Sequence, residues 1–327
     1  MTMTRFFAVI FFTCTGCWAT LSEAQQRWPT KQIRIVVPFP AGGSPDIVAR
    51  LIGEVIQRTS GHAVVIDNKP GALGMLGADA VIREKPDGHT LLVTINSFFT
   101  LTPYVTKLTI DPMTEFLPIV ETSRNTLVLT GNIAFPPKTL PELVSYVKAN
   151  PGKVSFASYS PATVSHLAGL MLNDSAGIDM AHVGYKGTGP AQIDLIGGHI
   201  PVMVDAMSSA LAPVRDGRVR AYAVNSPARH PLAPAVPTFR EMGYTDLEVL
   251  TAWVGVFASK NTPKEIVSDI AAAIGLALQD EGVRTRMNQL GYFAPNSRSP
   301  QELREALQVE GRKLREIVAK KGITLTP

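Results

Sequence analysis

Residues 33–50 read IRIVVPFPAGGSPDIVAR and predict the start of an α/β fold. Their first part is a β-branched run typical of a buried strand, and the turn PAGG ends it. Ser44, Pro45 and Asp46 then suit the N-cap, the first helical position and the first turn of a helix. Apolar residues continue at helical spacing up to Gly61, so we expect a helix with one buried stripe.

The same order of strand, glycine-rich turn and helix recurs along the chain. We expect strands at residues 32–39, 63–67, 90–94, 126–130, 154–157 and 201–204. We expect further helices at residues 75–83, 140–150, 163–175, 189–196 and 300–321. Alternating strands and helices with short connections indicate a parallel sheet covered by helices. The predicted fold class is α/β, and a chain of 327 residues suggests two domains.

Two glycine-rich turns, residues 39–46 and 68–74, each lead from a strand into a helix. Backbone N–H groups at such a position suit an anion, and the turns converge if their strands are neighbours. The alternative is that the glycines only permit tight turns. The candidate ligand-binding residues in and beside these turns are Phe39, Ala41, Gly42, Gly43, Ser44, Asp46, Gly71, Ala72, Gly74 and Met75.

A third turn, residues 158–166 (SYSPATVSH), is rich in hydroxyl groups. Its candidates for ligand contact are Ser160, Thr163 and His166, which would reach a ligand across a cleft. The alternative is that Thr163 is a helix N-cap and that His166 is satisfied by its neighbours within the fold. We also name Ser97 as a candidate ligand-binding residue.

The sequence contains no motif of a recognised catalytic, metal or dinucleotide site. Residues 42–46 (GGSPD) resemble a nucleophile elbow, but Asp46 stands at the final glycine position and Pro45 lacks an amide for an oxyanion hole. The six histidines are scattered without metal-ligand spacing. We therefore predict no catalytic residue, no metal and no cofactor. The alternative from another class is an exported hydrolase that uses Ser44 with His166.

The first 24 residues have the build of a secretory signal peptide. Arg5 precedes an apolar stretch, and a small-x-Ala ending places cleavage after Ala24. Threonines and a serine interrupt the stretch, whereas a membrane anchor needs about 20 consecutive apolar residues. A lipoprotein signal at Cys17 is a second alternative. Because Cys14 and Cys17 are the only two cysteines, the exported protein would be free of thiols.

The formal charge of +4 is mild, and no cluster of five or six basic residues occurs. Nucleic acid therefore has no support as a partner. A slightly basic protein is compatible with an anionic small molecule, although the charge is explained equally well by solubility.

Several motifs taken together resemble the substrate-binding proteins of tripartite tricarboxylate transporters, also called the Bug family. The resemblance runs in order from residue 28 to the C-terminus. The motifs are IRIVVPFPAGGSPDIVAR (33–50), DNKPGALGMLG (67–77), PDGHTLL (86–92), HLAG (166–169), GYKGTGPAQIDLIGG (184–198) and VPT (236–238).

The resemblance implies a periplasmic receptor with two α/β domains, related to type II periplasmic binding proteins, and a ligand cleft between them. In that family the first two turns hold a ligand carboxylate through backbone amides and ordered waters. The opposite domain supplies the hydroxyl-rich turn and the loop after the strand that contains Asp205, which set ligand choice. This chain departs from the usual family pattern at Leu73, Ser160, Ala162, Leu170 and Gly184. Glycine is usual at residues 73, 160 and 162, glutamate at 170 and proline at 184.

We accordingly predict a periplasmic solute receptor that captures a small mono-, di- or tricarboxylate or a related anion by hinge closure. The expected partners are this ligand and, transiently, the integral-membrane subunits of a transporter; a sensor kinase as recipient is the alternative. We expect a monomer, with residues 25–126 and 250–327 as domain 1 and residues 127–249 as domain 2. Asp205 would suit an amine or a hydroxyl donor on the ligand.

Overall fold

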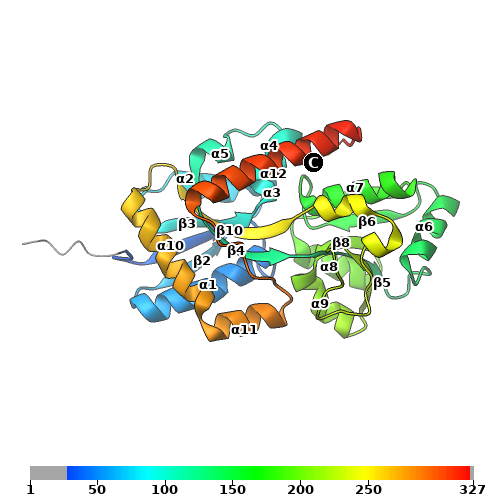
Figure 1. Ribbon diagram of the computed structural model, residues 1–327, viewed down its shortest axis with the longest axis horizontal. Helices are drawn as coiled ribbons and strands as arrows, with labels where there is room; N and C mark the ends of the chain where they lie inside the picture. The colour runs from blue at the N-terminus through cyan, green and yellow to red at the C-terminus, as the bar shows by residue number, and fades with distance from the viewer. Residues whose placement is uncertain (1–27, 325–327) are drawn as a thin grey trace, which may run out of the picture.

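Two five-stranded sheets organise the chain in the computed structural model, which describes residues 28–324 (Figure 1). The first sheet has the strand order β2-β1-β3-β10-β4 and the second the order β7-β6-β8-β5-β9. Each sheet with its helices forms one domain, and the two domains lie side by side. The predicted signal peptide falls outside the described residues. Within them, no helix has the length and apolar character needed to cross a membrane.

The first domain carries strands and helices from both ends of the described chain. Its strands are β1 (Ile33–Val37), β2 (Val64–Asn68), β3 (Thr90–Ile95), β4 (Phe116–Asn125) and β10 (Ala252–Ser259). Its helices are α1 (Ser44–Ser60), α2 (Met75–Ile82), α3 (Ser97–Thr100), α4 (Thr102–Val105), α5 (Pro112–Glu115), α10 (Lys264–Gln279), α11 (Glu281–Gln289) and α12 (Pro300–Lys320). A short 3-10 turn, η1 (Ala72–Gly74), precedes α2.

The second domain is formed by the middle of the chain. Its strands are β5 (Leu127–Asn132), β6 (Ser155–Ser158), β7 (Ala181–Gly184), β8 (Val202–Ala206) and β9 (Val219–Val224). Its helices are α6 (Leu140–Ala149), α7 (Val164–Ala176), α8 (Thr188–Gly197) and α9 (Met207–Arg215), followed by the short 3-10 turns η2 (Arg240–Met242) and η3 (Thr245–Val249).

Residues 35–37 of β1 are buried on both faces of the sheet, which explains why they are all apolar. Ile35 and Val37 belong to the core that also contains residues of α1 and α10, whereas Val36 belongs to the core that also contains residues of α2 and α12. Helices therefore cover both faces of the sheet, as the alternating pattern predicted. The predicted α/β class is confirmed.

The sheets are mixed rather than wholly parallel. Strands β1, β2 and β3 run parallel, but β10 is antiparallel to both β3 and β4. In the second sheet β5 is antiparallel to β8 and β9. The two antiparallel strands, β5 and β10, are each the first strand that the chain forms after it crosses from the other domain. No crossover helix returns it to a parallel direction, so it runs against its neighbours.

The chain crosses between the sheets twice. Strand β4 ends at Asn125 and β5 begins at Leu127, so the first crossing is a continuous extended segment. The second crossing lies between η3 and β10. We propose these two crossings as the domain boundaries, which gives residues 25–126 and 250–327 for domain 1 and 127–249 for domain 2.

Strands β4, β7, β9 and β10 are absent from the strands predicted above, and the bounds of the others shift by at most two residues. Strand β4 (FLPIVETSRN) contains a proline and two charged residues, which interrupt its apolar pattern. Strand β10 contains Gly255, over which the Trp253 ring packs so closely that a Cβ atom would lie 3.0 Å from it. The predicted N-cap Ser44 is instead the first residue of α1, and Gly43 takes the N-cap position.

Two helical glycines give opposite predictions for protein stability. A Cβ atom at Gly169 in α7 would lie 2.0 Å from the Phe156 ring, whereas one at Gly275 in α10 would meet nothing within 4 Å. We expect Gly169→Ala to destabilise the protein by about 1–3 kcal/mol through overpacking. Gly275→Ala should stabilise it by about 0.5–1 kcal/mol through helix propensity. Denaturant unfolding measures both free energies of unfolding. A loss of stability in Gly275→Ala as large as that in Gly169→Ala would contradict the packing described for the two glycines.

Candidate functional site

The two glycine-rich turns of the first domain start side by side. Strands β1 and β2 pair in parallel, with Val37 opposite Asn68. The Lys69 N–H then donates to the Val37 carbonyl at 2.8 Å. The condition set by the sequence, that the two strands be neighbours, is therefore met, and both turns emerge at one edge of the sheet.

The buried carboxylate of Asp46 holds the first turn in shape. It accepts hydrogen bonds from the Gly42 N–H at 2.9 Å, from Arg50 at 2.9 and 3.0 Å, and from the Asn68 amide at 3.0 Å. The same Asn68 amide donates to the Phe39 carbonyl at 3.0 Å, which links the second strand to the first turn. Burial alone would raise the pKa of Asp46, but the donors outweigh it and lower the pKa below its usual value. Asp46 thus stabilises the shape of the turn, and the Gly42 N–H is already bonded to its carboxylate.

The second turn has four consecutive residues with positive φ. These are Gly71 (126°), Ala72 (47°), Leu73 (55°) and Gly74 (97°). Left-handed backbone costs a non-glycine residue roughly 1–2 kcal/mol, so Ala72 and Leu73 are held there by the surrounding fold. Strain of this kind gathers at ligand sites, which makes this turn a candidate ligand contact.

A cavity of about 40 Å³ lies between the domains, and we call it the inner cavity. It is lined from the first turn, from the ends of β3, β4 and β10, and from the second domain. The lining residues are Phe39, Pro40, Gly43, Ser44, Pro45, Ile95, Asn125, Tyr159, Gly187, Thr188, Ala206, Ala252, Trp253 and Val254. None of them has a charged side chain.

A second pocket of about 260 Å³, the outer pocket, is also lined from both domains. The first domain contributes Pro38, Phe39, Pro70, Gly71, Ala72, Leu73 and Gly74, and the second contributes Ser160, Pro161, Gly184, Tyr185 and Lys186. Phe39 lines both the inner cavity and the outer pocket. Three departures from the usual family pattern, Leu73, Ser160 and Gly184, therefore lie around this one pocket.

Asn125, the last residue of β4, connects the first turn to the second domain. Its side-chain amide donates to Ser44 Oγ at 3.1 Å and to Ser208 Oγ at 3.0 Å, and its Oδ1 accepts from the Ser208 N–H at 3.2 Å. Tyr292 adds a hydrogen bond to the Ser44 carbonyl at 3.3 Å. Because Asn125 also lines the inner cavity, it joins this cavity to the first crossing.

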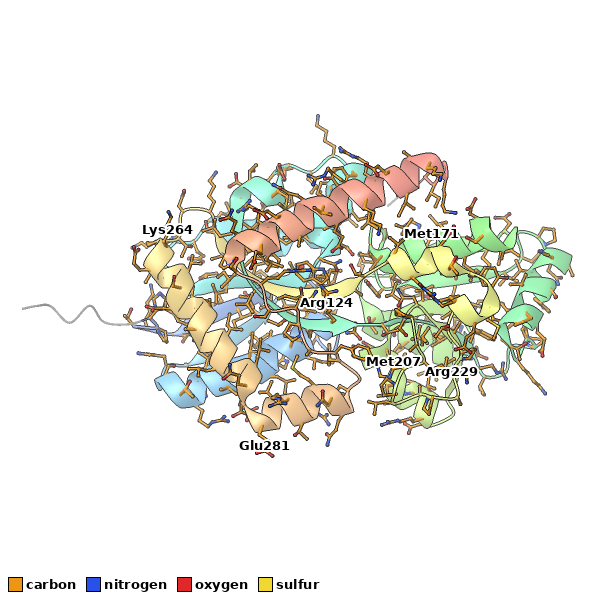
Figure 2. The ribbon with its side chains drawn as sticks, in the orientation of Figure 1. Arg124, Met171, Met207, Arg229, Lys264 and Glu281 are labelled. Atoms are coloured by element: carbon orange, nitrogen blue, oxygen red, sulfur yellow. The ribbon has the colours of Figure 1, made fainter. Side chains whose placement is uncertain are left out.

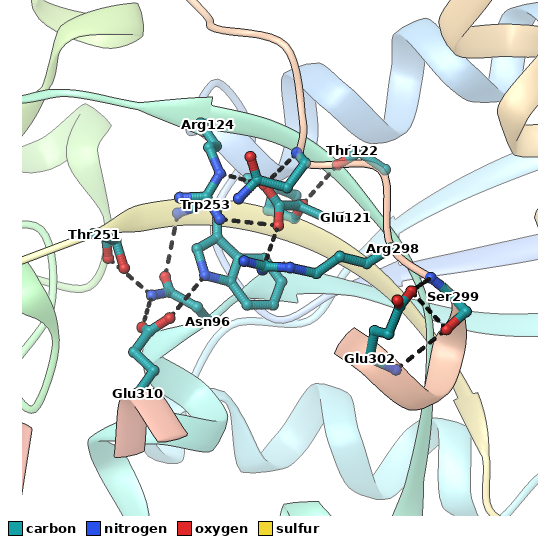
Figure 3. A network of polar contacts seen from close by, with 12 residues as sticks. Asn96, Glu121, Thr122, Arg124, Thr251, Trp253, Arg298, Ser299, Glu302 and Glu310 are labelled. Carbon is teal, nitrogen blue, oxygen red and sulfur yellow. Dashed lines mark hydrogen bonds and ion pairs between the residues drawn. The ribbon is translucent and has the colours of Figure 1, made fainter. Parts of the chain in front are cut away.

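Polar networks fix both crossing strands on the side of the first domain (Figure 3). Glu310 of α12 accepts from the Trp253 indole N–H at 3.0 Å and from the Asn96 amide. The same amide donates to the Thr251 carbonyl at 2.8 Å, so β10 is held where it enters the sheet. Burial raises the pKa of Glu310 despite these donors.

On the neighbouring strand, the fully buried Glu121 accepts from Arg124 at 3.0 Å and from Arg298 at 3.2 Å. Arg124 lies at the junction of the two domains (Figure 2). The end of β4 is therefore fixed next to the first crossing.

Asp205 lies behind the inner cavity rather than in its lining. It is 1% exposed and accepts hydrogen bonds from Thr188 Oγ1 at 3.2 Å, Gln192 Nε2 at 2.9 Å and the Ala206 N–H at 2.8 Å. Burial is the larger effect and raises the pKa of Asp205 to about 7, and the three hydrogen bonds limit this rise. Its hydrogen bond orients Thr188, which does line the cavity.

Two hydrogen bonds tie the third turn to the first domain. Ser97 Oγ accepts from the Val164 N–H at 3.2 Å, and Thr102 Oγ1 donates to the Ala162 carbonyl at 3.2 Å. Ala162 has a φ of 57°, a conformation that favours glycine, which gives a physical reason for the glycine usual at this place. Thr163 is the N-cap residue of α7, but its hydroxyl donates to the Ser160 carbonyl at 2.7 Å.

His166 stacks on His182 inside the second domain, with ring centroids 3.5 Å apart and an interplanar angle of 14°. The Ala162 N–H donates to His166 Nδ1 at 3.3 Å, and Ser158 Oγ lies 2.7 Å from His182 Nε2. Burial and the neighbouring His182 lower the pKa of His166 to about 3, and burial lowers the pKa of His182 to about 4. Both rings are neutral at pH 7. Ser44 and His166 share no hydrogen bond, because their partners are Asn125 and Ala162.

The structure brings seven of the predicted residues into the two pockets. Phe39, Gly43 and Ser44 line the inner cavity, and Phe39, Gly71, Ala72, Gly74 and Ser160 line the outer pocket. The others lie behind or beside these linings, namely Ala41, Gly42, Asp46, Met75, Ser97, Thr163, His166 and Asp205.

Other pocket residues were missed by sequence reasoning. Asn125 and Thr188 are polar residues next to a domain crossing and a glycine-rich turn, and that position is the signal that could have found them. Trp253 carried no such signal, because β10 itself was missed.

Comparison with known proteins places the chain among periplasmic receptors. Residues 48–323 match the model of the tripartite tricarboxylate transporter family receptor. The periplasmic binding protein BugD is 35% identical, with a TM-score of 0.85, over 91% of this chain and 99% of BugD.

Two further solved structures come from Rhodopseudomonas palustris. MatC, with bound malate, is 34% identical with a TM-score of 0.83 over 89% of this chain and 100% of MatC. A second protein, with adipate, is 27% identical with a TM-score of 0.86, and the match covers 91% of this chain and 99% of that protein's chain. The resemblance stated from the motifs and the two-domain architecture that it implies are both confirmed.

The stacked histidines predict a loss of stability in acid. An unfolded chain takes up protons on histidine near pH 6.5, whereas the folded pair resists protonation down to about pH 4. Stability from the neutral pair is therefore complete above pH 6.5 and falls as the pH is lowered below it. We expect the drop in Tm between pH 7 and pH 5 to shrink in His182→Gln but not in the control His199→Gln, which changes an exposed histidine. An unchanged drop in His182→Gln would contradict this.

Proposed function

Because the chain belongs to the tripartite tricarboxylate transporter family of receptors, we propose that it is a periplasmic protein that captures a small carboxylate and delivers it to a membrane transporter. It carries out no chemistry on its ligand. The observation that carries this proposal is the pair of adjoining pockets between the domains, placed where two glycine-rich turns leave neighbouring strands.

The lining of the site suits recognition of a small acid by backbone and hydroxyl groups. The inner cavity has no charged side chain, so an acid there would be held by the N–H groups that open α1 and by the hydroxyl of Ser44, whose oxygen accepts from Asn125 and whose hydrogen is left to donate. Malate and adipate, the molecules bound in two of the similar structures, are both carboxylates, which supports this ligand class.

Domain closure is the proposed mechanism of capture. Several contacts join the domains around the site, including the hydrogen bonds of Ser97 and Thr102 to the third turn. Gly187 approaches Pro40 of the first turn so closely that a Cβ atom would lie 2.7 Å from its ring. A ligand that touches both domains binds the closed state better than the open one and shifts the population toward it.

The export signal that the sequence predicts in residues 1–24 supports the periplasmic location, and we propose a monomer that meets the transporter transiently. Delivery to a sensor kinase would use the same site. An exported hydrolase is less well supported, because Ser44 Oγ is bonded to Asn125 and His166 lies in the histidine stack. Turnover of ester substrates that is lost in Ser44→Ala would favour the hydrolase.

A thermal-shift screen with mono-, di- and tricarboxylates tests the proposed function. At 100 times its Kd, a ligand that binds only the folded protein adds about 2.7 kcal/mol of stability. We therefore expect a clear rise in Tm with one or a few of the acids, confirmed by calorimetry. No response to any acid in a broad panel would refute carboxylate binding.

Closure is tested by a pair of glycine variants in one segment. Gly187→Ala places a methyl group against Pro40 and strains a φ of 131°, whereas a Cβ atom at Gly189, two residues on, meets nothing within 4 Å. We expect Gly187→Ala to weaken ligand binding by at least about tenfold, equivalent to 1.4 kcal/mol, with Gly189→Ala close to wild type. Equal affinities of the two variants, measured by calorimetry, would argue against closure at Gly187.

A further inference from the structure

We propose that Lys186 in the outer pocket is the counter-charge for a second acid group of the ligand and so makes the receptor selective for dicarboxylates. This inference rests on the proposed function, which it extends from a ligand class to a residue that selects within it. Under this inference the two pockets bind different parts of the ligand. The inner cavity binds uncharged parts or the first acid group, and the outer pocket binds the second acid group.

Charge is distributed unequally between the two pockets. Among the described residues that line the outer pocket, Lys186 is the only one with a charged side chain. The lining of the inner cavity has none. A second acid placed in the inner cavity would therefore meet no counter-charge. The outer pocket is therefore the favourable place for a second negative charge.

The other cations near the two turns are already committed. Arg50 pairs with Asp46 at 2.9 Å, Arg34 pairs with Asp67 at 2.6 Å, and Lys69 lies 3.7 Å from Asp67. Lys186 forms no ion pair with any residue that the structure describes. Its ammonium group is thus left to interact with a ligand or with solvent.

The backbone around Lys186 is held in place on both sides. Gly184 packs against Pro161 so closely that a Cβ atom would lie 2.4 Å from its ring, and the Tyr185 hydroxyl donates to Asp194 at 2.7 Å. On the other side Gly187 touches Pro40 of the first domain. The stem of Lys186 therefore starts from a fixed point in the lining of a pocket that both domains form and that the strained turn of residues 71–74 also lines.

The test compares acids that differ only in the second carboxylate. Calorimetry gives the Kd of succinate against butyrate and of adipate against hexanoate for wild type, Lys186→Gln, Lys186→Arg and the control Lys153→Gln. Lys153 is an exposed lysine of the second domain that lines neither pocket. Because Lys186 is exposed, thermal unfolding should show that all variants fold like wild type.

We expect wild type to bind a dicarboxylate more tightly than the matching monocarboxylate. Lys186→Gln should weaken the affinity for the dicarboxylate about fivefold to tenfold and change the affinity for the monocarboxylate less than about twofold. Lys186→Arg should keep most of the preference, and Lys153→Gln all of it. The preference should also fall with added salt in wild type more than in Lys186→Gln.

Two outcomes would overturn the inference while leaving the proposed function intact. One is a wild-type protein that binds the monocarboxylates as tightly as the dicarboxylates. The other is a Lys186→Gln variant that keeps the wild-type preference or loses both ligands equally. Failure of wild type to bind any acid in the panel would instead refute the proposed function, and the inference with it.

Discussion

The buried carboxylate of Asp46 is the constraint on which the proposed ligand site depends. One side chain accepts from the first turn through Gly42, from α1 through Arg50 and from β2 through Asn68, which in turn holds the Phe39 carbonyl. A buried carboxylate that lost these donors would destabilise the fold. The hydrogen bonds therefore keep the turn, the helix and the second strand fixed together. The residues that open α1, which line the inner cavity, are thereby held in place.

The two crossings convert this local order into a two-domain site. Asn125 at the first crossing bonds both Ser44 and Ser208, and the Glu310 network holds β10 at the second. Away from the cleft, Lys321 at the end of α12 reaches Asp174 at 2.6 Å in the opposite domain (Figure 1). These contacts surround the pockets, so the geometry of the site belongs to the relation between the domains rather than to either one alone.

Backbone strain marks the parts of the site that differ from the usual family pattern. Leu73 and Ala162 adopt φ values of 55° and 57° where a glycine would pay no steric penalty, and each lies in a turn at the domain interface. At residue 184 the reverse holds, since glycine stands where there is no room for a Cβ atom beside Pro161. The second and third turns are therefore packed against particular neighbours in this chain, which sets the shape of the outer pocket.

The sequence by itself determined the α/β class, the turns at the ends of β1 and β2 and the family, because periodicity and glycine spacing are local properties of the chain. It could not reveal β10, whose pattern is broken by Gly255, nor the antiparallel strands that follow each crossing. Only the tertiary structure decided that Asp46 and Asp205 support the site from behind, that His166 stacks on His182, and that Asn125, Thr188 and Lys186 reach the pockets. These roles depend on contacts between residues far apart in the chain, and no local pattern encodes which distant group a side chain will meet.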